Sequence, residues 1–179
     1  MNNDKVSSSF EGPYDHFHES AYEHADSIIS VETNAAESTE AFPLRIVSAS
    51  KDGNLIVWRI NSETHDEDKL TFVADFVIDE PLTKAKWLNE KSILTTTTHG
   101  NVYILKLEKD GQNAECLSRP SLVFRANHSV SIWDCAVLSK SPRLEVWLAE
   151  DSGKVTQLFF DASLQMTGSK TVYVSVSFI

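Results

Sequence analysis

Three glycine turns at nearly equal spacing limit the folds that this chain of 179 residues can adopt. The turns lie in SASKDGNLIVW (48–58), TTTTHGNVYIL (95–105) and LAEDSGKVTQL (148–158). Their glycines, Gly53, Gly100 and Gly153, are 47 and 53 residues apart. In each case a β-prone run precedes a tight turn that ends in glycine, and a second run with alternating apolar positions follows the turn. Glycine supplies the positive φ that such hairpins need. The sequence therefore predicts an internal repeat with a period near 50 residues.

Short runs rich in Val, Ile, Thr, Phe, Tyr and Trp fill the chain from about residue 24 onward. They are SIISVET (27–33), LRIVSAS (44–50), NLIVWRI (54–60), LTFVADFVI (70–78), SILTTTT (92–98), NVYILKL (101–107), LEVWLAE (144–150) and KVTQLFF (154–160). Turn or charged residues bound nearly every run, which is typical of antiparallel hairpins. No segment of ten or more residues keeps apolar positions at helical spacing, so no long helix is expected. Because a period of about 40–50 residues made of four short strands is typical of a propeller blade, the expected fold class is all-β, an incomplete β-propeller of antiparallel four-stranded blades.

The first repeat carries two dipeptides at characteristic places, Glu23-His24 before its first strand and Trp58-Arg59 at the end of LRIVSASKDGNLIVWRI. It resembles the WD-repeat β-propeller family, which usually has Gly-His and Trp-Asp there. The resemblance implies that His24, Ser48, Asp52 and Trp58 form a hydrogen-bonded network within the blade. A turn carboxylate, a buried imidazole and a buried indole N–H can satisfy one another, so we interpret His24 and Asp52 as parts of a structural clamp and not as a catalytic pair.

The second and third repeats depart from this pattern. The residues at the dipeptide, turn and Trp positions are Asp79-Glu80, His99 and Leu105 in the second repeat, and Asn127-His128, Ser152 and Leu158 in the third. A shift of one residue would let Asp151 serve as the turn residue. The full clamp is therefore expected in the first repeat. The predicted blades cover about residues 23–78, 79–126 and 127–179, and TVYVSVSFI (171–179) is either the outer strand of the third blade or the inner strand of a fourth.

Negative charge is concentrated in the N-terminal part of the chain. Residues 1–40 hold nine acids and one base, whereas residues 41–179 hold 17 acids and 15 bases, out of a formal net charge of −10. Residues 1–22 have no sustained apolar period, so we expect them to form a flexible acidic arm. The arm contains three aromatic residues, Tyr14, Phe17 and Tyr22. An alternative is therefore that it docks on a surface or folds with a partner.

Motifs for catalysis are missing: the sequence has no nucleophile elbow, phosphate-binding glycine loop or HExxH pair. His16 and His18 could face one side of an extended strand and bind zinc or copper, but a polar terminal arm offers no rigid frame, so neither metal nor cofactor is expected. Cys116 and Cys135 are too few for a disulfide framework or a thiolate zinc site and are expected as small buried or half-buried hydrophobes.

The composition also excludes classes of partner. Basic residues are interleaved with acids, so no direct nucleic-acid binding is expected. No run of about 18 apolar residues and no signal peptide occur, which predicts a protein that is cytoplasmic or nuclear and neither secreted nor inserted in a membrane.

The length does not suffice for a closed ring, because a propeller takes about four to eight blades and this chain has about three. We expect a fragment, an incomplete gene product, or part of a propeller that another copy or a partner completes. The resemblance implies a non-enzymatic scaffold for protein–protein interaction within a larger nucleocytoplasmic complex, without a small-molecule substrate. The alternative is a targeting segment of an enzyme or nucleic-acid-processing factor whose active domain lies outside this chain.

Overall fold

The computed structural model describes residues 23–34, 43–60, 70–127, 130–140 and 143–173, so the expected acidic arm of residues 1–22 lies outside the described residues. Within these ranges regular structure is entirely β, and no helix that could span a membrane occurs there. The expected all-β fold class is therefore confirmed.

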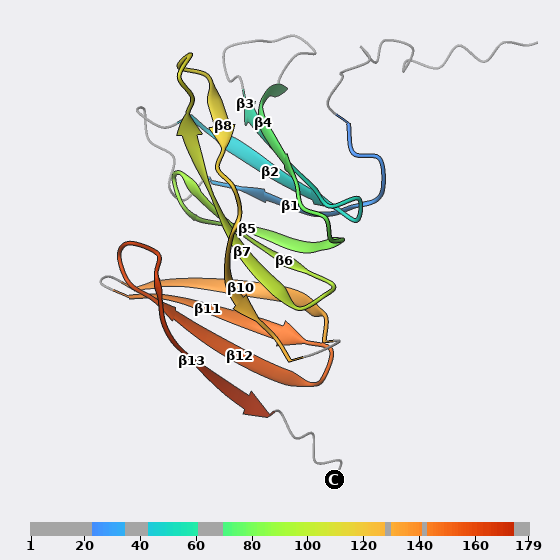
Figure 1. Cartoon of the computed structure of the whole chain (residues 1–179), viewed down its shortest axis with the longest axis vertical. Coiled ribbons are helices and arrows are strands. Elements are labelled where there is room, and N and C mark those ends of the chain that lie inside the picture. The colour runs from blue at the N-terminus through green and yellow to red at the C-terminus, as the bar shows by residue number, and fades with distance from the viewer. Residues whose placement is uncertain (1–22, 35–42, 61–69, 128–129, 141–142, 174–179) are drawn as a thin grey trace, which may run out of the picture.

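Antiparallel pairing divides the strands into three sheets, called blades 1, 2 and 3 below (Figure 1). Blade 1 has the order β1 (Ile28–Thr33), β2 (Arg45–Ser50), β3 (Asn54–Ile60) and β4 (Leu70–Val77). Blade 2 has β5 (Leu82–Asn89), β6 (Ser92–Thr97) and β7 (Asn101–Lys109), with both β8 (Glu115–Leu117) and β9 (Ser121–Arg125) paired to β7. Blade 3 has β10 (Ile132–Lys140), β11 (Arg143–Glu150), β12 (Lys154–Phe160) and β13 (Met166–Tyr173). Residues 171–173 thus belong to the outer strand of blade 3, and residues 174–179 are not described.

The blades stack in chain order, with blade 2 between blades 1 and 3 (Figure 1). Side chains alternate between the two faces of a sheet. We call the face toward the following blade the forward face, and the face toward the preceding blade the rear face. Residues at the same distance from the turn glycine occupy the same place in each blade, as do the inner-strand residues that pair with them and the dipeptides that precede the first strands, and we call residues in the same place counterparts.

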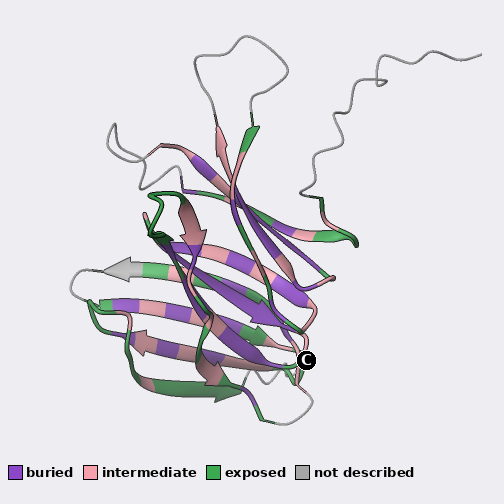
Figure 2. Ribbon diagram, turned by 45° about the horizontal axis from the view of Figure 1, so that its top comes forward, coloured by how far each residue is buried: buried purple, intermediate pink, exposed green. Residues whose placement is uncertain are grey.

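Two hydrophobic clusters hold the stack together. In the first, Val47, Leu55 and Val57 on the forward face of blade 1 pack with Ile93 and Leu105 of blade 2. The second joins blade 2 to blade 3, and it contains Leu94, Val102, Ile104, Val146, Leu148 and Leu158. In Figure 2 the buried segments gather where the blades meet, while β13 is mostly exposed. Each interface therefore joins the forward face of one blade to the rear face of the next.

The three hairpin glycines have positive φ angles, of 83° at Gly53 and 75° at both Gly100 and Gly153. The chain entering the next blade covers the first two turns. The N–H of Ile78 donates to the Gly53 carbonyl at 2.9 Å, and the N–H of Ala126 donates to the Gly100 carbonyl at 2.8 Å. A Cβ at Gly53 would collide with the Ile78 carbonyl oxygen, and one at Gly100 with the Val130 carbonyl oxygen. A Cβ at Gly153 would meet no atom within 4 Å.

Candidate functional site

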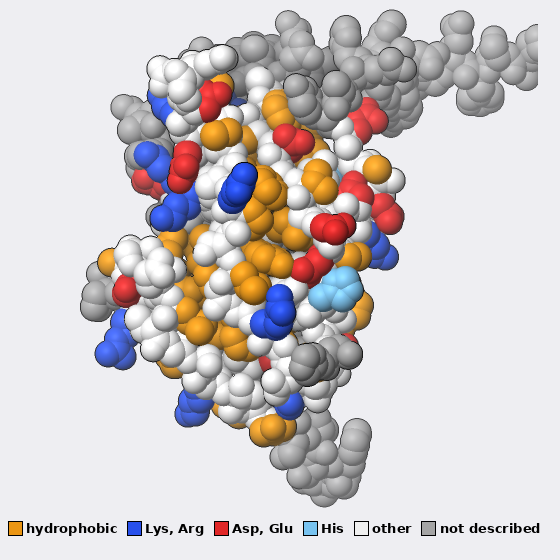
Figure 3. All heavy atoms as spheres, in the orientation of Figure 1, with side chains coloured by type: hydrophobic (Ala, Val, Ile, Leu, Met, Phe, Trp, Pro, Cys, Tyr) orange, Lys and Arg blue, Asp and Glu red, His pale blue; other side chains and the backbone are white. Residues whose placement is uncertain are grey.

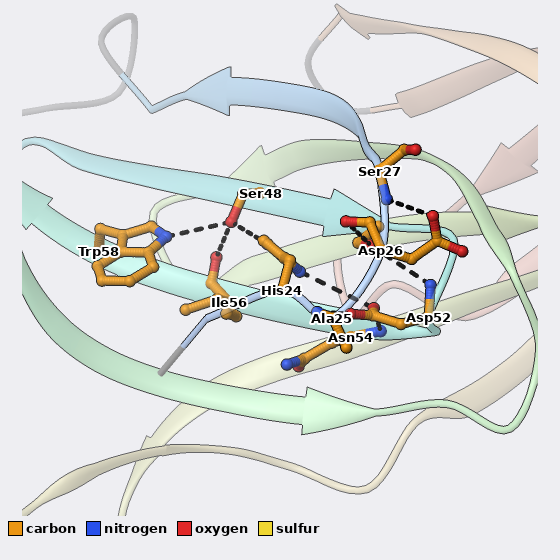
Figure 4. Close-up of polar contacts among 10 residues, drawn as sticks. His24, Ala25, Asp26, Ser27, Ser48, Asp52, Asn54, Ile56 and Trp58 are labelled. Atoms are coloured by element: carbon orange, nitrogen blue, oxygen red, sulfur yellow. Dashed lines mark hydrogen bonds and ion pairs between the residues drawn. The ribbon is translucent and has the colours of Figure 1, made fainter. Parts of the chain in front are cut away.

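The four predicted clamp residues of blade 1 lie together around the hydroxyl of Ser48 on β2 (Figure 4). The Trp58 Nε1–H, on β3, donates to Ser48 Oγ at 3.1 Å. Ser48 Oγ also lies 2.7 Å from Nε2 of His24, which precedes β1. The edge of Trp58 meets the ring of Phe72 on β4, with ring centroids 6.3 Å apart. One hydroxyl thereby links the segment before the inner strand to β2 and β3.

Asp52 fastens the same segment to the β2–β3 turn. Its carboxylate accepts the N–H of Ala25 at 2.6 Å and the N–H of Asn54 at 2.7 Å. Nδ1 of His24 lies 3.9 Å from Asp52 Oδ1, which is beyond hydrogen-bond distance, and this buried nitrogen has no hydrogen-bond partner among the described residues. The expected partners at both imidazole nitrogens are thus found at Nε2 but not at Nδ1.

Burial and hydrogen bonds set the charge of this pair. Burial lowers the pKa of His24, and the Asp52 carboxylate only partly offsets it, so the imidazole is largely neutral near pH 7. Burial opposes ionisation of Asp52, but hydrogen bonds led by the N–H groups of Asn54 and Ala25 lower its pKa. The polar atoms of this cluster mainly form hydrogen bonds with one another. Its stabilising role remains a prediction that mutation can test.

Blade 2 contains a polar cluster that the sequence analysis missed. Glu80 takes the place of the clamp histidine, and its carboxylate accepts hydrogen bonds from Thr97 Oγ1 at 2.6 Å and from Tyr103 OH at 2.7 Å. Asn101 Nδ2 donates to both carboxylate oxygens, at 2.7 and 2.9 Å, and His99 Nδ1 lies 3.6 Å from one of them. The sequence contains both the glutamate at the dipeptide position and the donors around the Gly100 turn, but it gives no sign that they meet.

This carboxylate is ionised because its donors outweigh its burial. Burial alone would raise the pKa of Glu80, but hydrogen bonds from Thr97, Tyr103 and Asn101 lower it. Burial and the hydrogen bond to Glu80 raise the pKa of Tyr103 to about 12. Blade 2 therefore replaces an imidazole clamp with an anionic one.

Blade 3 has a smaller polar group. Thr156 Oγ1 donates to Glu150 at 2.5 Å and lies 3.0 Å from Thr171 Oγ1 on β13. Ser152, at the turn position, donates to Glu150 at 3.2 Å, and Leu158 is buried. His128 of the predicted dipeptide lies outside the described residues.

The inner strands carry paired charges around a hollow of about 440 Å³. Lys86 on β5 lies 2.7 Å from Glu32 on β1, and Lys84 on β5 lies 3.2 Å from Asp134 on β10. These opposite charges neutralise one another across both blade interfaces. The described residues gather no group of three or more side chains suited to a metal ion.

Two histidines were considered as metal ligands, and two cysteines were expected to be buried or half-buried. His16 and His18 lie outside the described residues. Cys135 is buried and Cys116 half-buried. Burial, together with the neighbouring charge of Asp134, raises the pKa of the Cys135 thiol to about 12, so this thiol is protonated at neutral pH.

Comparison with solved structures decides the architecture. The chain resembles the β-propeller domain of Cps50 (Swd1) from Myceliophteria thermophila with a TM-score of 0.57 and 10% sequence identity, over 87% of this chain and 45% of that chain. This chain folds as part of a β-propeller. It spans less than half the length of that propeller domain. No family model and no curated protein sequence matches the chain.

The forward face of blade 3 differs from those of the other two blades in this partial propeller. Trp133 and Leu138 on β10 are 60% and 46% exposed. Trp147 on β11 is half-buried, whereas its counterparts Val47 and Leu94 are fully buried. A shallow hollow of about 170 Å³ lies here, lined mainly by small and apolar residues: Ala136, Trp147, Ala149 and Val155. No blade among the described residues covers this face.

Exposed hydrophobic side chains also occur elsewhere. In the view of Figure 3 they gather over the middle of the molecule, with charged side chains around them. Leu122 on β9 is exposed to nearly the same extent as Leu138. Exposed apolar area of this kind is typical of interaction surfaces, and the blade 3 face stands out because the counterparts of Trp147, Ala149 and Val155 are buried.

Proposed function

We propose that this partial propeller is a non-enzymatic module for protein–protein interaction, of the WD-repeat kind that the first repeat resembles, and that it works as a subunit of a larger assembly. The observation that carries the proposal is the forward face of blade 3. The counterparts of Trp147, Ala149 and Val155 are buried in both blade 1 and blade 2, so the repeat favours a protein surface as the cover of these positions. We call this surface the blade 3 face.

The titratable groups support a structural role for the polar clusters. Asp52 and Glu80 accept hydrogen bonds from their own blades, and Tyr103 donates to Glu80. A catalytic acid or base needs a free path to a substrate atom, and these groups spend their hydrogen-bonding capacity within the fold. The lysines of the hollow are likewise paired with carboxylates.

Other features of the proposal rest on the sequence. We place the module in the cytoplasm or the nucleus, with proteins as partners and without nucleic acid, membrane or small-molecule ligands.

The test compares the proteins that purify with the tagged full chain from its own cells, with wild type, Leu138→Glu and Leu122→Glu analysed side by side. Both leucines are similarly exposed, but Leu138 lies on the blade 3 face and Leu122 on β9 of blade 2. A charge at Leu138 should reduce specific partners by about tenfold or more, as expected for a loss of about 1.4 kcal/mol or more. Leu122→Glu should retain them.

Equal recovery of every partner by all three proteins would contradict the proposal. Thermal unfolding of each purified variant checks that neither substitution acts through stability. Because both side chains are about half exposed, we expect both variants to fold.

A further inference from the structure

We infer that the partner of the blade 3 face is blade 1 of a second copy of this chain, so that two copies close a six-bladed ring head to tail. The inference rests on the proposed function, since it names what covers the blade 3 face. Its basis is a packing mode that the chain already uses twice.

The two interfaces within the chain follow one rule. The forward face of blade 1 packs on the rear face of blade 2, and the forward face of blade 2 packs on the rear face of blade 3. A forward face therefore accepts a rear face. After blade 3, the rear face in this chain that no described blade covers is that of blade 1.

The rear face of blade 1 has the exposed apolar residues that this contact needs. Val31 on β1 is 59% exposed, whereas its counterparts Ala85 and Cys135 are buried by the preceding blade. All three face a residue five positions before the turn glycine, so they occupy the same place in their sheets. Leu70 and Val77 on β4 and Ile28 on β1 are also more than half exposed.

The turn at Gly153 is also suited to a following blade. Gly53 is covered by the segment that enters blade 2, where both Ile78 and Glu80 approach it. The counterpart of Glu80 at the entrance to blade 1 is His24. In the ring, the segment of the second copy that begins at Glu23 would lie over Gly153, where a Cβ now meets no atom within 4 Å.

The number of blades agrees with closure. A propeller ring takes about four to eight blades, and the three described blades of two copies make six. A head-to-tail contact that closes after two copies has twofold symmetry and two identical interfaces.

The test is the solution mass of the purified full chain, measured by light scattering and sedimentation over a range of concentrations. We expect wild type to have twice the mass of one chain. Val31→Glu and Leu138→Glu each place a charge in both interfaces, and each should give the mass of a single chain. The matched control, Leu122→Glu, should keep the doubled mass.

Three results would overturn the inference. The first is a wild-type mass of one chain at all concentrations. The second is a dimer that Leu138→Glu abolishes and Val31→Glu does not, since this indicates contact between two blade 3 faces. The third is a mass that grows without stopping at two chains, which indicates an open filament.

Cross-linking of wild type detects the same contact between copies without any substitution, so it does not depend on the folding of the variants. Copies with light and heavy isotopes are mixed, and lysine cross-links between light and heavy chains are identified. We expect Lys51 in the β2–β3 turn of one copy to join Lys154 at the β11–β12 turn of the other, because corresponding turns of adjacent blades lie at the same end. Cross-links between copies that join Lys154 to Lys154 without any to Lys51 would contradict it.

The two proposals fail in different ways. If wild type has the mass of a single chain and Leu138→Glu still loses its partners, the two-copy ring is refuted and the interaction module stands. Unchanged partners and unchanged mass in Leu138→Glu remove both.

Discussion

Polar side-chain groups collect hydrogen bonds at the entrances to blades 1 and 2, and their chemistry differs between the two blades. In blade 1 the Ser48 hydroxyl joins an imidazole and an indole N–H. In blade 2 the Glu80 carboxylate collects donors from both sides of its turn. Both solutions satisfy buried polar groups that would otherwise cost about 1–3 kcal/mol each.

Ser48→Ala removes the hydroxyl at the centre of the blade 1 clamp. The Trp58 N–H loses its acceptor and His24 Nε2 its partner, so we expect the free energy of unfolding to fall by about 1–3 kcal/mol in urea titrations. Ser169→Ala, at an exposed serine of β13, should change it by less than about 0.5 kcal/mol. Equal effects of the two substitutions would contradict the clamp role of Ser48.

Glu80→Gln tests the anionic clamp through pH. Because the folded pKa of Glu80 lies below the ordinary value of 4.5, its ionised form stabilises the fold above that pH, and this stability is lost as the pH falls through the folded pKa. The variant should be less stable than wild type by about 1–3 kcal/mol at pH 7, and the gap should narrow below pH 4.5. Destabilisation from protonating His24, which sets in below about pH 6.5, is common to both proteins and cancels in the difference. A gap that stays constant from pH 7 to the acid limit of folding would disprove this role.

Strands were predictable where hydrophobic alternation and turn glycines acted together. Each of the eight predicted runs contains or overlaps a strand of the structure. The short outer strands β8 and β9 were missed, because long-range contacts fix them. Glu115 on β8 pairs with Arg45 at 2.5 Å and with Arg59 at 2.8 Å, so blade 1 holds this strand in place.

The four residues of the blade 1 clamp could be named from the sequence because the first repeat resembles the WD-repeat pattern, and their structural role stays a prediction. The Glu80 cluster was not, because the same geometry is built there from different residue types. No local pattern indicates that a glutamate at a dipeptide position will meet Thr97, Asn101 and Tyr103. That information lies in the pairing of β6 with β7 and in the path of the chain into blade 2.

The described residues form a stack with two interfaces between blades and two outer faces that none of these blades covers. A chain of 179 residues has the length of a single domain, yet the fold that it forms is about half of a propeller. The same contrast appears in the turns, where described residues cover Gly53 and Gly100 but none lies within 4 Å of a Cβ placed at Gly153. The central claim is that blades 1 and 2 are each covered by the blade that follows, whereas no described residue of the same chain covers blade 3.

The free energies of unfolding of Gly53→Ala, Gly100→Ala and Gly153→Ala test this claim most directly, measured in the Leu138→Glu background so that contacts within one chain are compared. All three residues have positive φ, which costs alanine about 1–2 kcal/mol. Gly53→Ala and Gly100→Ala also force a Cβ against a linker carbonyl and should lose about 4 kcal/mol or more, whereas Gly153→Ala should lose the backbone term only. Equal losses at all three positions would contradict the account.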